Sequence, residues 1–241
     1  MRTLRAVLRV RSRPLPLDAA RPFVVFSPHP DDETLGCGGT IALLCRSRVD
    51  VRIVFVTDGS QSHPSHPTIS PGEIASIRCA EAQRATESLG VGAGAVSFLG
   101  ARDGMLALLD GGDSDRLAAQ IKEVLEQMQP EAILLPCRLD GSSEHEAVFA
   151  LVNRALAESS VKARIYEFPV WSLWSPQFLL RNLFTYAKVW RSDISKVHEM
   201  KLRALACYPS QAYPLAPDTQ AALPSGFVSM FQGRDEFLFE A

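Results

Sequence analysis

Residues 23–33 read Phe-Val-Val-Phe-Ser-Pro-His-Pro-Asp-Asp-Glu, in which a short apolar run changes abruptly into an acidic segment flanked by prolines. The apolar residues Phe23 to Phe26 have the composition of a strand buried on both faces, as in a parallel sheet. Proline fixes its own φ and disfavours the helical region for the preceding residue, so the backbone around His29 should be extended and stiff. The stretch therefore predicts a buried strand followed by a rigid loop of ligand-type side chains. It lies at the strand end where open α/β sheets bind ligands.

The rest of the chain alternates between apolar, β-rich runs and segments of helical periodicity. This alternation predicts an open, mostly parallel α/β sheet with right-handed crossovers. No internal repeat or linker interrupts it, so we expect one domain over 1–241, with an N-terminal extension over 1–20 and a C-terminal elaboration over about 171–241. Further strands are predicted at 51–57, 96–99, 132–136 and 163–169, and helices across 41–49, 73–89, 115–129, a segment starting at Ser143, and 194–207.

The composition is that of an ordinary globular protein, with 46% apolar and 22% charged residues among 241. The formal net charge of -2 provides no basic excess to attract phosphate backbones, so nucleic acid is not an expected partner. No stretch is apolar enough to span a bilayer, and the five scattered cysteines, without a C-x-x-C pair, are typical of a reducing compartment. We therefore expect a cytoplasmic protein.

Arginines recur along the N-terminal segment, at positions 2, 5, 9, 11 and 13. They interrupt the apolar residues too often for the core of a signal peptide. We expect a frayed or strand-pairing tail here. A short amphipathic segment on a surface or a membrane interface is the alternative.

A histidine far along the chain could complete a metal site with the first loop. A capping-box pattern beginning at Ser143 places His145 in the first turn of a helix after the fourth strand. If the first and fourth strands are neighbours, as doubly wound order commonly makes them, His29, Asp32 and His145 converge. Two histidines and one carboxylate with open positions describe a catalytic zinc site, and also a non-haem iron centre. The remaining carboxylate, Asp31, is then free to act as a general base.

Each of these features also has a purely structural interpretation. The acidic run from Asp31 to Glu33 could be a solvated turn that caps the next helix, and a histidine at a helix start is commonly a surface residue. The glycines between Gly36 and Gly39 could cradle a dinucleotide pyrophosphate, but glycine would be needed where Ile41 stands, and the acidic residues upstream would repel phosphate. We therefore expect these small residues to let the helix approach the sheet closely.

The run from Pro28 to Glu33 resembles, letter for letter, the P-H-P-D-D-E-like signature of the PIG-L/LmbE-like N-deacetylases. The resemblance implies a Rossmann-like three-layer sandwich with a mostly parallel central sheet. It also implies a zinc ion bound by His29, Asp32 and His145, with Asp31 as the general base. Similar features follow in the family's order over most of the chain: Val56-Thr-Asp-Gly59, Ser62-His63-Pro64, Arg78-x-x-Glu81, Leu89-Gly90, Phe98-Leu-Gly100, Asp103-Gly104, Lys201 and Ser210-Gln211.

The resemblance further implies the reaction and the class of substrate. Family members hydrolyse acetamido groups, mostly on N-acetylglucosamine-type sugars linked to lipids, thiol precursors or antibiotics. We therefore expect a small-molecule or lipid-linked amino-sugar substrate, from which acetate is released to leave a free amine. Arg78 matches a position near the substrate in relatives, although it could instead be a cation on a helix surface, and Asp103 is a second candidate for substrate binding. The sequence favours no particular oligomeric state.

Two positions before His145 depart from the family pattern. Many relatives carry H-x-D-H ending at the last metal ligand, and its first histidine is thought to stabilise the tetrahedral intermediate. Here Ser142 stands in that place, and Glu144 replaces the aspartate. Ser142 can donate a hydrogen bond to the intermediate only as a neutral group. His63 or His66, in the loop 58–72, could instead stabilise the intermediate. The alternative is that these two histidines are exposed polar residues of the loop. A chain without this helper could also be a glycan-binding or scaffold protein with weak catalysis.

Overall fold

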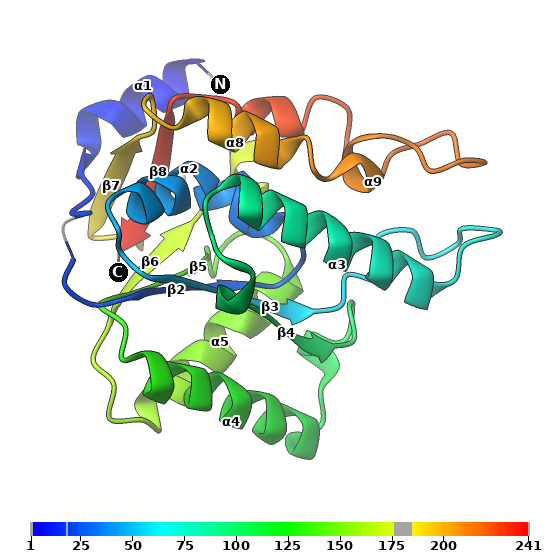
Figure 1. Cartoon of the computed structure of the whole chain (residues 1–241), viewed down its shortest axis with the longest axis horizontal. Coiled ribbons are helices and arrows are strands. Elements are labelled where there is room, and N and C mark those ends of the chain that lie inside the picture. The colour runs from blue at the N-terminus through cyan, green and yellow to red at the C-terminus, as the bar shows by residue number, and fades with distance from the viewer. Residues whose placement is uncertain (1, 18, 176–184, 241) are drawn as a thin grey trace.

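The computed structural model describes residues 2–17, 19–175 and 185–240, and residues 176–184 of the predicted C-terminal elaboration lie outside the described residues. The described residues form a sheet of eight strands in the order β1-β7-β8-β6-β5-β2-β3-β4 (Figure 1). Neighbouring strands are parallel except in the pairs β6–β8 and β7–β8. The strands are β1 (Arg13–Pro14), β2 (Phe23–Ser27), β3 (Val51–Thr57), β4 (Val96–Ala101), β5 (Ala132–Pro136), β6 (Arg164–Phe168), β7 (Lys188–Asp193) and β8 (Asp235–Glu240).

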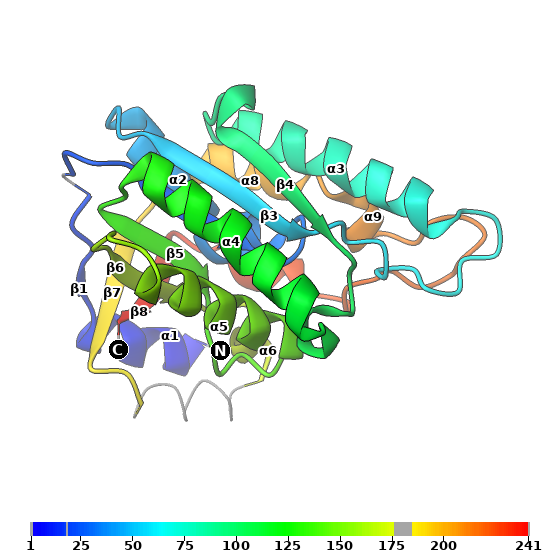
Figure 2. The ribbon, with the colours of Figure 1, turned by 90° about the horizontal axis from the view of Figure 1, so that it is seen from below.

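Helices cover both faces of this sheet. Helices α2, α3 and α8 lie on one face, and α4 and α5 lie on the other (Figure 1, Figure 2). The predicted α/β three-layer fold with a mostly parallel sheet is therefore confirmed. The α-helices are α1 (Arg2–Arg11), α2 (Asp32–Arg46), α3 (Pro71–Ser88), α4 (Gly111–Met128), α5 (Ser143–Ala157), α6 (Trp171–Trp174), α8 (His198–Leu205) and α9 (Pro209–Ala212), and the 3-10 helices are Ala93–Ala95, Leu106–Leu108 and Val228–Phe231.

Strand β2, which begins the stretch 23–33, supplies side chains to two hydrophobic cores. Phe23 and Val25 of β2 pack into the core that contains residues of α2 and α8. Val24 and Phe26 pack into the core formed with α4 and α5. Successive side chains of a strand point to opposite faces of a sheet, so a strand covered on both faces must be apolar throughout.

The glycines of α2 allow this helix to lie directly against its neighbours. A β-carbon on Gly36 would lie 2.1 Å from the ring of Phe168 in β6, and one on Gly39 would lie 2.6 Å from Ile194. No side chain larger than hydrogen fits at either position without movement of its neighbour. The expectation that these small residues serve close packing is confirmed.

Helix α2 is kinked, and a buried ion pair satisfies the backbone groups at the kink. Cys37 has non-helical φ/ψ of −142° and 18°. The Glu236 carboxylate accepts hydrogen bonds from the backbone amides of residues 39–40, and the Lys201 amine donates to Glu236 and to the backbone carbonyl of Leu35. Unpaired backbone groups are costly in a protein interior, so this pair from α8 and β8 keeps the kink stable.

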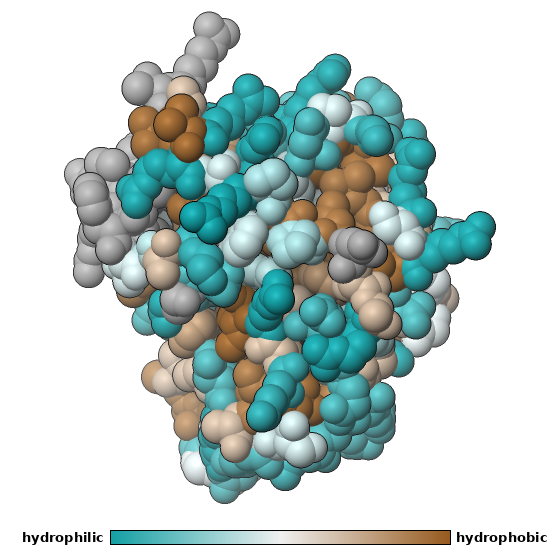
Figure 3. Space-filling view, turned by 90° about the vertical axis from the view of Figure 1, so that its left-hand side faces the viewer, coloured by the Kyte–Doolittle hydropathy of each residue, from teal (hydrophilic) through white to brown (hydrophobic). Residues whose placement is uncertain are grey.

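The N-terminal segment is a docked helix, so the prediction of a frayed tail is wrong. Leu8 of α1 is fully buried, the Arg5 guanidinium donates to the Met230 carbonyl, and Arg9 pairs with Asp235. Strand β1 then pairs with β7, as a strand-pairing tail would. Hydrophilic side chains cover much of the side of the molecule on which α1 lies (Figure 3). Within the described ranges, no helix combines the length and apolar content needed to cross a membrane.

Strands β7 and β8 were not predicted from the sequence. They pair antiparallel with each other, and β8 also pairs antiparallel with β6. Acidic residues occupy both ends of β8, and Glu236 stands at a position that is only 4% exposed. A glutamate is compatible with a buried strand position only when it is paired, and the sequence does not show that pairing. The hydrophobic pattern of β8 is therefore too weak to predict a strand.

Candidate functional site

The candidate site lies where the carboxyl ends of β2 and β5 meet. The segment after β2 carries His29 and Asp31 and leads into α2 at Asp32, and the segment after β5 leads into α5, which carries His145. Strands β2 and β5 are parallel neighbours, and this is the condition under which the sequence predicted that His29, Asp32 and His145 converge. Their pairing brings together residues that are more than a hundred positions apart in the chain.

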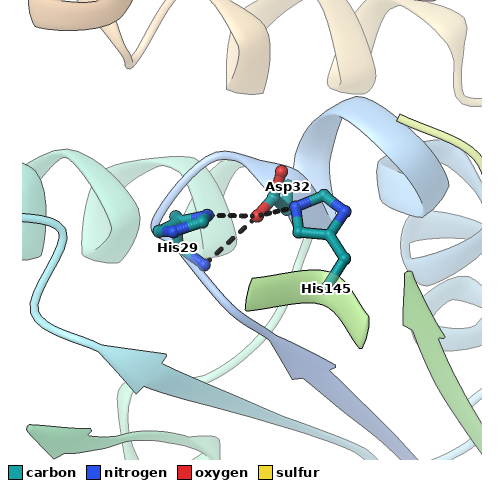
Figure 4. A group of neighbouring side chains, drawn as sticks. All are labelled: His29, Asp32 and His145. Atoms are coloured by element: carbon teal, nitrogen blue, oxygen red, sulfur yellow. Dashed lines mark hydrogen bonds and ion pairs between the residues drawn. The ribbon is translucent and has the colours of Figure 1, made fainter. Parts of the chain in front are cut away.

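His29, Asp32 and His145 form a tight cluster. The Asp32 Oδ2 atom lies 3.0 Å from His29 Nδ1 and 3.3 Å from His145 Nε2. Figure 4 shows the two imidazoles on either side of the Asp32 carboxylate. One nitrogen of each ring and one carboxylate oxygen all lie within 4.8 Å of one another, an arrangement that can hold a metal ion.

Asp140 determines which ring nitrogen of His145 is available to bind a cation. Its carboxylate lies 2.8 Å from His145 Nδ1 and accepts backbone amides from residues 170–172, so it holds the Nδ1 proton. His145 is fully buried, and its Nε2 atom has no partner among the described residues apart from the 3.3 Å ion-pair contact with Asp32. Burial opposes the charged ring, but Asp32 and Asp140 outweigh it and raise the pKa of His145 to about 9. The negative field that favours a proton on Nε2 also favours a bound cation.

His29 is oriented in the same way by two carboxylates on its far side. Its Nε2 atom lies 2.8 Å from Glu144 and 3.2 Å from Asp103, which leaves Nδ1 facing Asp32. The second oxygens of the two carboxylates accept the backbone amides of Leu106 and Gln61. The structure therefore places Asp103 beside His29, a predicted metal ligand. It also shows that Glu144, which replaces the aspartate of the H-x-D-H pattern, contacts His29. The sequence did not predict this contact.

Asp31 sits in a constrained backbone next to this cluster. It is 5% exposed, and its φ of 138° is unusual for a residue with a side chain. Its amide donates to Glu33, and its carboxylate lies 3.3 Å from the Arg78 guanidinium. Arg78 also donates to the carbonyls of Pro30 and Gly59. Burial raises the pKa of Asp31 to about 8, although Arg78 acts in the opposite direction.

Arg78 is 3% exposed, so its interpretation as a cation on a helix surface is wrong. It lies in the middle of α3, where exposure depends on what the helix packs against. The forked contacts of its guanidinium with the loops after β2 and β3 explain its burial.

A cavity of about 260 Å³ opens over these groups. His29, Asp31 and Asp32 contribute to its lining, and Arg78 and Ser62 add polar groups. The aromatic side chains of Trp171 and Phe227 line it as well, and their ring centroids are 4.7 Å apart. Ionised and apolar surfaces thus face the same space, as in sites that bind small polar molecules.

Three other candidates from the sequence, Ser142, His63 and His66, lie outside the lining of this cavity. Ser142 is the N-cap of α5, one residue earlier than the predicted Ser143, and its hydroxyl accepts the His145 amide at 3.4 Å. His63 is 7% exposed and therefore buried, and its Nδ1 atom lies 3.0 Å from the Ser62 hydroxyl. His66 accepts backbone amides of its own loop and contacts the Leu215 carbonyl, so its ring holds the loop together.

Several buried partners of the site were missed by sequence reasoning. Asp140 lies five residues before His145. Nothing in the sequence around it distinguishes it from an ordinary aspartate in a loop. Gln211 lines the cavity from α9, and its resemblance to a family feature was the only signal. Tyr208 donates to Glu33 from the same segment.

The fold and the sequence resemble those of known deacetylases. The fold is similar to that of N,N'-diacetylchitobiose deacetylase from Pyrococcus horikoshii, with a TM-score of 0.63 and 22% identity over 95% of this chain and 80% of that one. The sequence is 27% identical over 209 residues to the diacetylchitobiose deacetylase of Thermococcus kodakarensis, covering 81% of this chain and 72% of that protein.

A similar fold also occurs in the 4-carboxy-2-hydroxymuconate hydratase from Pseudomonas putida KT2440, with a TM-score of 0.65 and 21% identity over 79% of this chain and 80% of that one. The fold alone therefore does not select the reaction. Residues 24–156, more than half of the chain, match the family model described as PIG-L, GlcNAc-PI de-N-acetylase. They contain the loop after β2 as well as His145, and the protein belongs to the PIG-L family of de-N-acetylases.

Proposed function

We propose that the protein is a metal-dependent hydrolase that removes the acetyl group from an N-acetylglucosamine-type sugar, releasing acetate and a free amine. The observation that carries this proposal is the buried Nε2 atom of His145, which faces Asp32 at 3.3 Å beside His29 and, apart from this ion-pair contact, has no partner among the described residues. Membership of the family, and the deacetylase activity for which the Thermococcus kodakarensis relative is named, support the same reaction.

We propose zinc as the metal, held by His29 Nδ1, Asp32 Oδ2 and His145 Nε2. Zinc supplies Lewis-acid chemistry, because it polarises a carbonyl group and lowers the pKa of water. Iron(II) is the alternative for two histidines and one carboxylate. Elemental analysis of protein purified without added metal distinguishes the two.

The charge around the cluster supports a divalent cation. Buried carboxylates lie in or beside it and are opposed by Arg78 and the two histidines. Because a buried carboxylate without a compensating charge is costly, a bound cation would stabilise this arrangement. Six such carboxylates occur among the residues that the structure describes, and they belong to Asp31, Asp32, Glu33, Asp103, Asp140 and Glu144.

Asp31 is the residue we assign to proton transfer. It lines the cavity next to the proposed ligand Asp32, where a carboxylate can accept a proton and return it. It takes a proton from the attacking water and delivers it to the amine nitrogen as the C–N bond breaks. Arg78 orients the carboxylate through their 3.3 Å contact and holds the preceding loop through the Pro30 carbonyl.

Acetate release from a panel of N-acetylated sugars tests this proposal. The panel contains N-acetylglucosamine, N,N'-diacetylchitobiose and an N-acetylglucosaminyl lipid, and mass spectrometry follows the loss of acetyl. We expect acetate release that a chelator abolishes and that zinc restores. Binding of these glycans without any release of acetate would refute the hydrolase and favour a glycan-binding protein.

A further inference from the structure

The hydrogen bonds around the cavity identify a donor for the negative charge that develops during amide hydrolysis. In the family pattern this role falls to a histidine, at the position that Ser142 occupies here. Ser142 caps α5 and does not line the cavity. Ser62 and Gln211 do line the cavity, and their side chains carry hydrogen-bond donors.

The orientation of Gln211 follows from its neighbours. The buried Glu81 carboxylate accepts the Ser210 amide at 2.9 Å and the Ser210 hydroxyl at 2.6 Å. A hydroxyl has one proton, so the Ser210 oxygen can only accept from the Gln211 side chain, which lies 2.8 Å away. The atom facing Ser210 must therefore be the Gln211 amide nitrogen, and that same nitrogen lies 3.4 Å from the Ser62 oxygen.

His63 determines where the proton of Ser62 points. The ring is 7% exposed, and burial lowers its pKa, so it is neutral at pH 7. Its Nδ1 atom lies 3.0 Å from the Ser62 oxygen, and its Nε2 atom is buried without a hydrogen-bond partner among the described residues. A buried N–H without an acceptor is rarer than a lone pair without a donor, which places the proton on Nδ1.

With this assignment, the Ser62 oxygen accepts from both His63 and Gln211. Its own proton is used by neither neighbour, and the residue lines the cavity that contains Asp31, Asp32 and Arg78. The hydroxyl is therefore free to donate into the cavity. We propose that Ser62 donates the hydrogen bond that stabilises the negative charge on the carbonyl oxygen of the acetamido group as water attacks. This role rests on the proposed hydrolase function.

Ser62 keeps its proton throughout, so its contribution is electrostatic and strongest when the carbonyl oxygen is charged. Ser62→Ala should then lower kcat by about 100- to 1000-fold, the loss typical for one such donor, with KM little changed. Ser62→Thr keeps the hydroxyl and should restore most of the rate. Ser65→Ala is the matched control, because Ser65 is exposed in the same loop, and it should behave as the wild type.

Binding measurements separate this role from a structural one. A methylphosphonamide analogue of the acetamido sugar imitates the tetrahedral intermediate, and glucosamine imitates the product. Ser62→Ala should weaken the analogue by about the same factor as kcat/KM, and glucosamine by less than about threefold. His63→Asn retains a donor at the place of Nδ1 and should retain more activity than His63→Leu.

The results have distinct meanings. Wild-type protein that releases no acetate from any sugar of the panel overturns the proposed function, and the role of Ser62 with it. A wild-type enzyme that is active, with Ser62→Ala within about threefold of it, overturns only the role of Ser62. Equal weakening of the analogue and of glucosamine also overturns it, because a structural defect would affect both ligands.

Discussion

Replacing Lys201 with methionine should leave the Glu236 carboxylate buried without its counter-ion. Lys201 is 1% exposed and Glu236 is 4% exposed, so water cannot take over the role of the amine. Removing one partner of a buried ion pair costs about 3–5 kcal/mol. Glu236 keeps its hydrogen bonds from the amides of residues 39–40 and from the Thr40 hydroxyl, which places the expected loss near the lower end of that range, at about 3 kcal/mol.

Urea unfolding measures this loss as a lower free energy of unfolding. For a chain of this length, the same loss corresponds to a Tm lower by about 6–12 °C. Lys188→Met is the matched control, because its side chain is 47% exposed and its pairing with Glu240 should contribute less than about 1 kcal/mol. If Lys201→Met and Lys188→Met had equal effects, the assigned importance of the buried pair for the kink of α2 would be refuted.

Three further substitutions and one metal experiment test the site and its support. Asp31→Asn should lower kcat by about 100- to 10,000-fold with unchanged metal content, and a fully active variant would exclude Asp31 as the base. Arg78→Lys keeps the charge but loses the forked contacts, so kcat should fall on the order of 10- to 100-fold with KM little changed; a change confined to KM would instead indicate that Arg78 binds substrate. Gly36→Ala forces a methyl group against Phe168 and should cost about 1–3 kcal/mol in urea unfolding, whereas unchanged stability would show that the ring can move aside. Zinc at roughly 1,000 times its Kd should stabilise the metal-free protein by about 4 kcal/mol, and a Tm that ignores both chelator and zinc would contradict the metal site.

The strands of the central sheet could be predicted because their signals are local. Strands β3 and β5 coincide with the predicted ranges 51–57 and 132–136, since a strand covered on both faces is predominantly apolar. Strand β8 escaped prediction because the buried Glu236, whose carboxylate is compensated by Lys201 and by donors of α2, breaks that pattern. The docking of α1 escaped prediction for a similar reason, because its arginines contact residues more than two hundred positions away.

In the candidate site, too, some features could be predicted from the sequence and others depend on tertiary contacts. Asp31, Asp32 and His29 could be singled out from the sequence, because strand, prolines and acidic residues are consecutive. The burial of Arg78 could not be predicted, because it depends on the distance between α3 and the loops after β2 and β3. The N-cap of α5 was misplaced by one residue because Ser142 and Ser143 are chemically equivalent, and only the backbone selects the one that caps the helix.

By itself, the sequence determined the buried strand β2 and the stiff loop that follows it, because eleven consecutive residues carry both signals. Only the tertiary structure decided which atoms of that loop are available for chemistry. Asp140 holds one nitrogen of His145, Glu144 and Asp103 hold one nitrogen of His29, and the second nitrogen of each ring is left facing Asp32. Hydrogen-bond partners are set by distances of about 3 Å between groups on different elements, and no pattern along the chain encodes such distances.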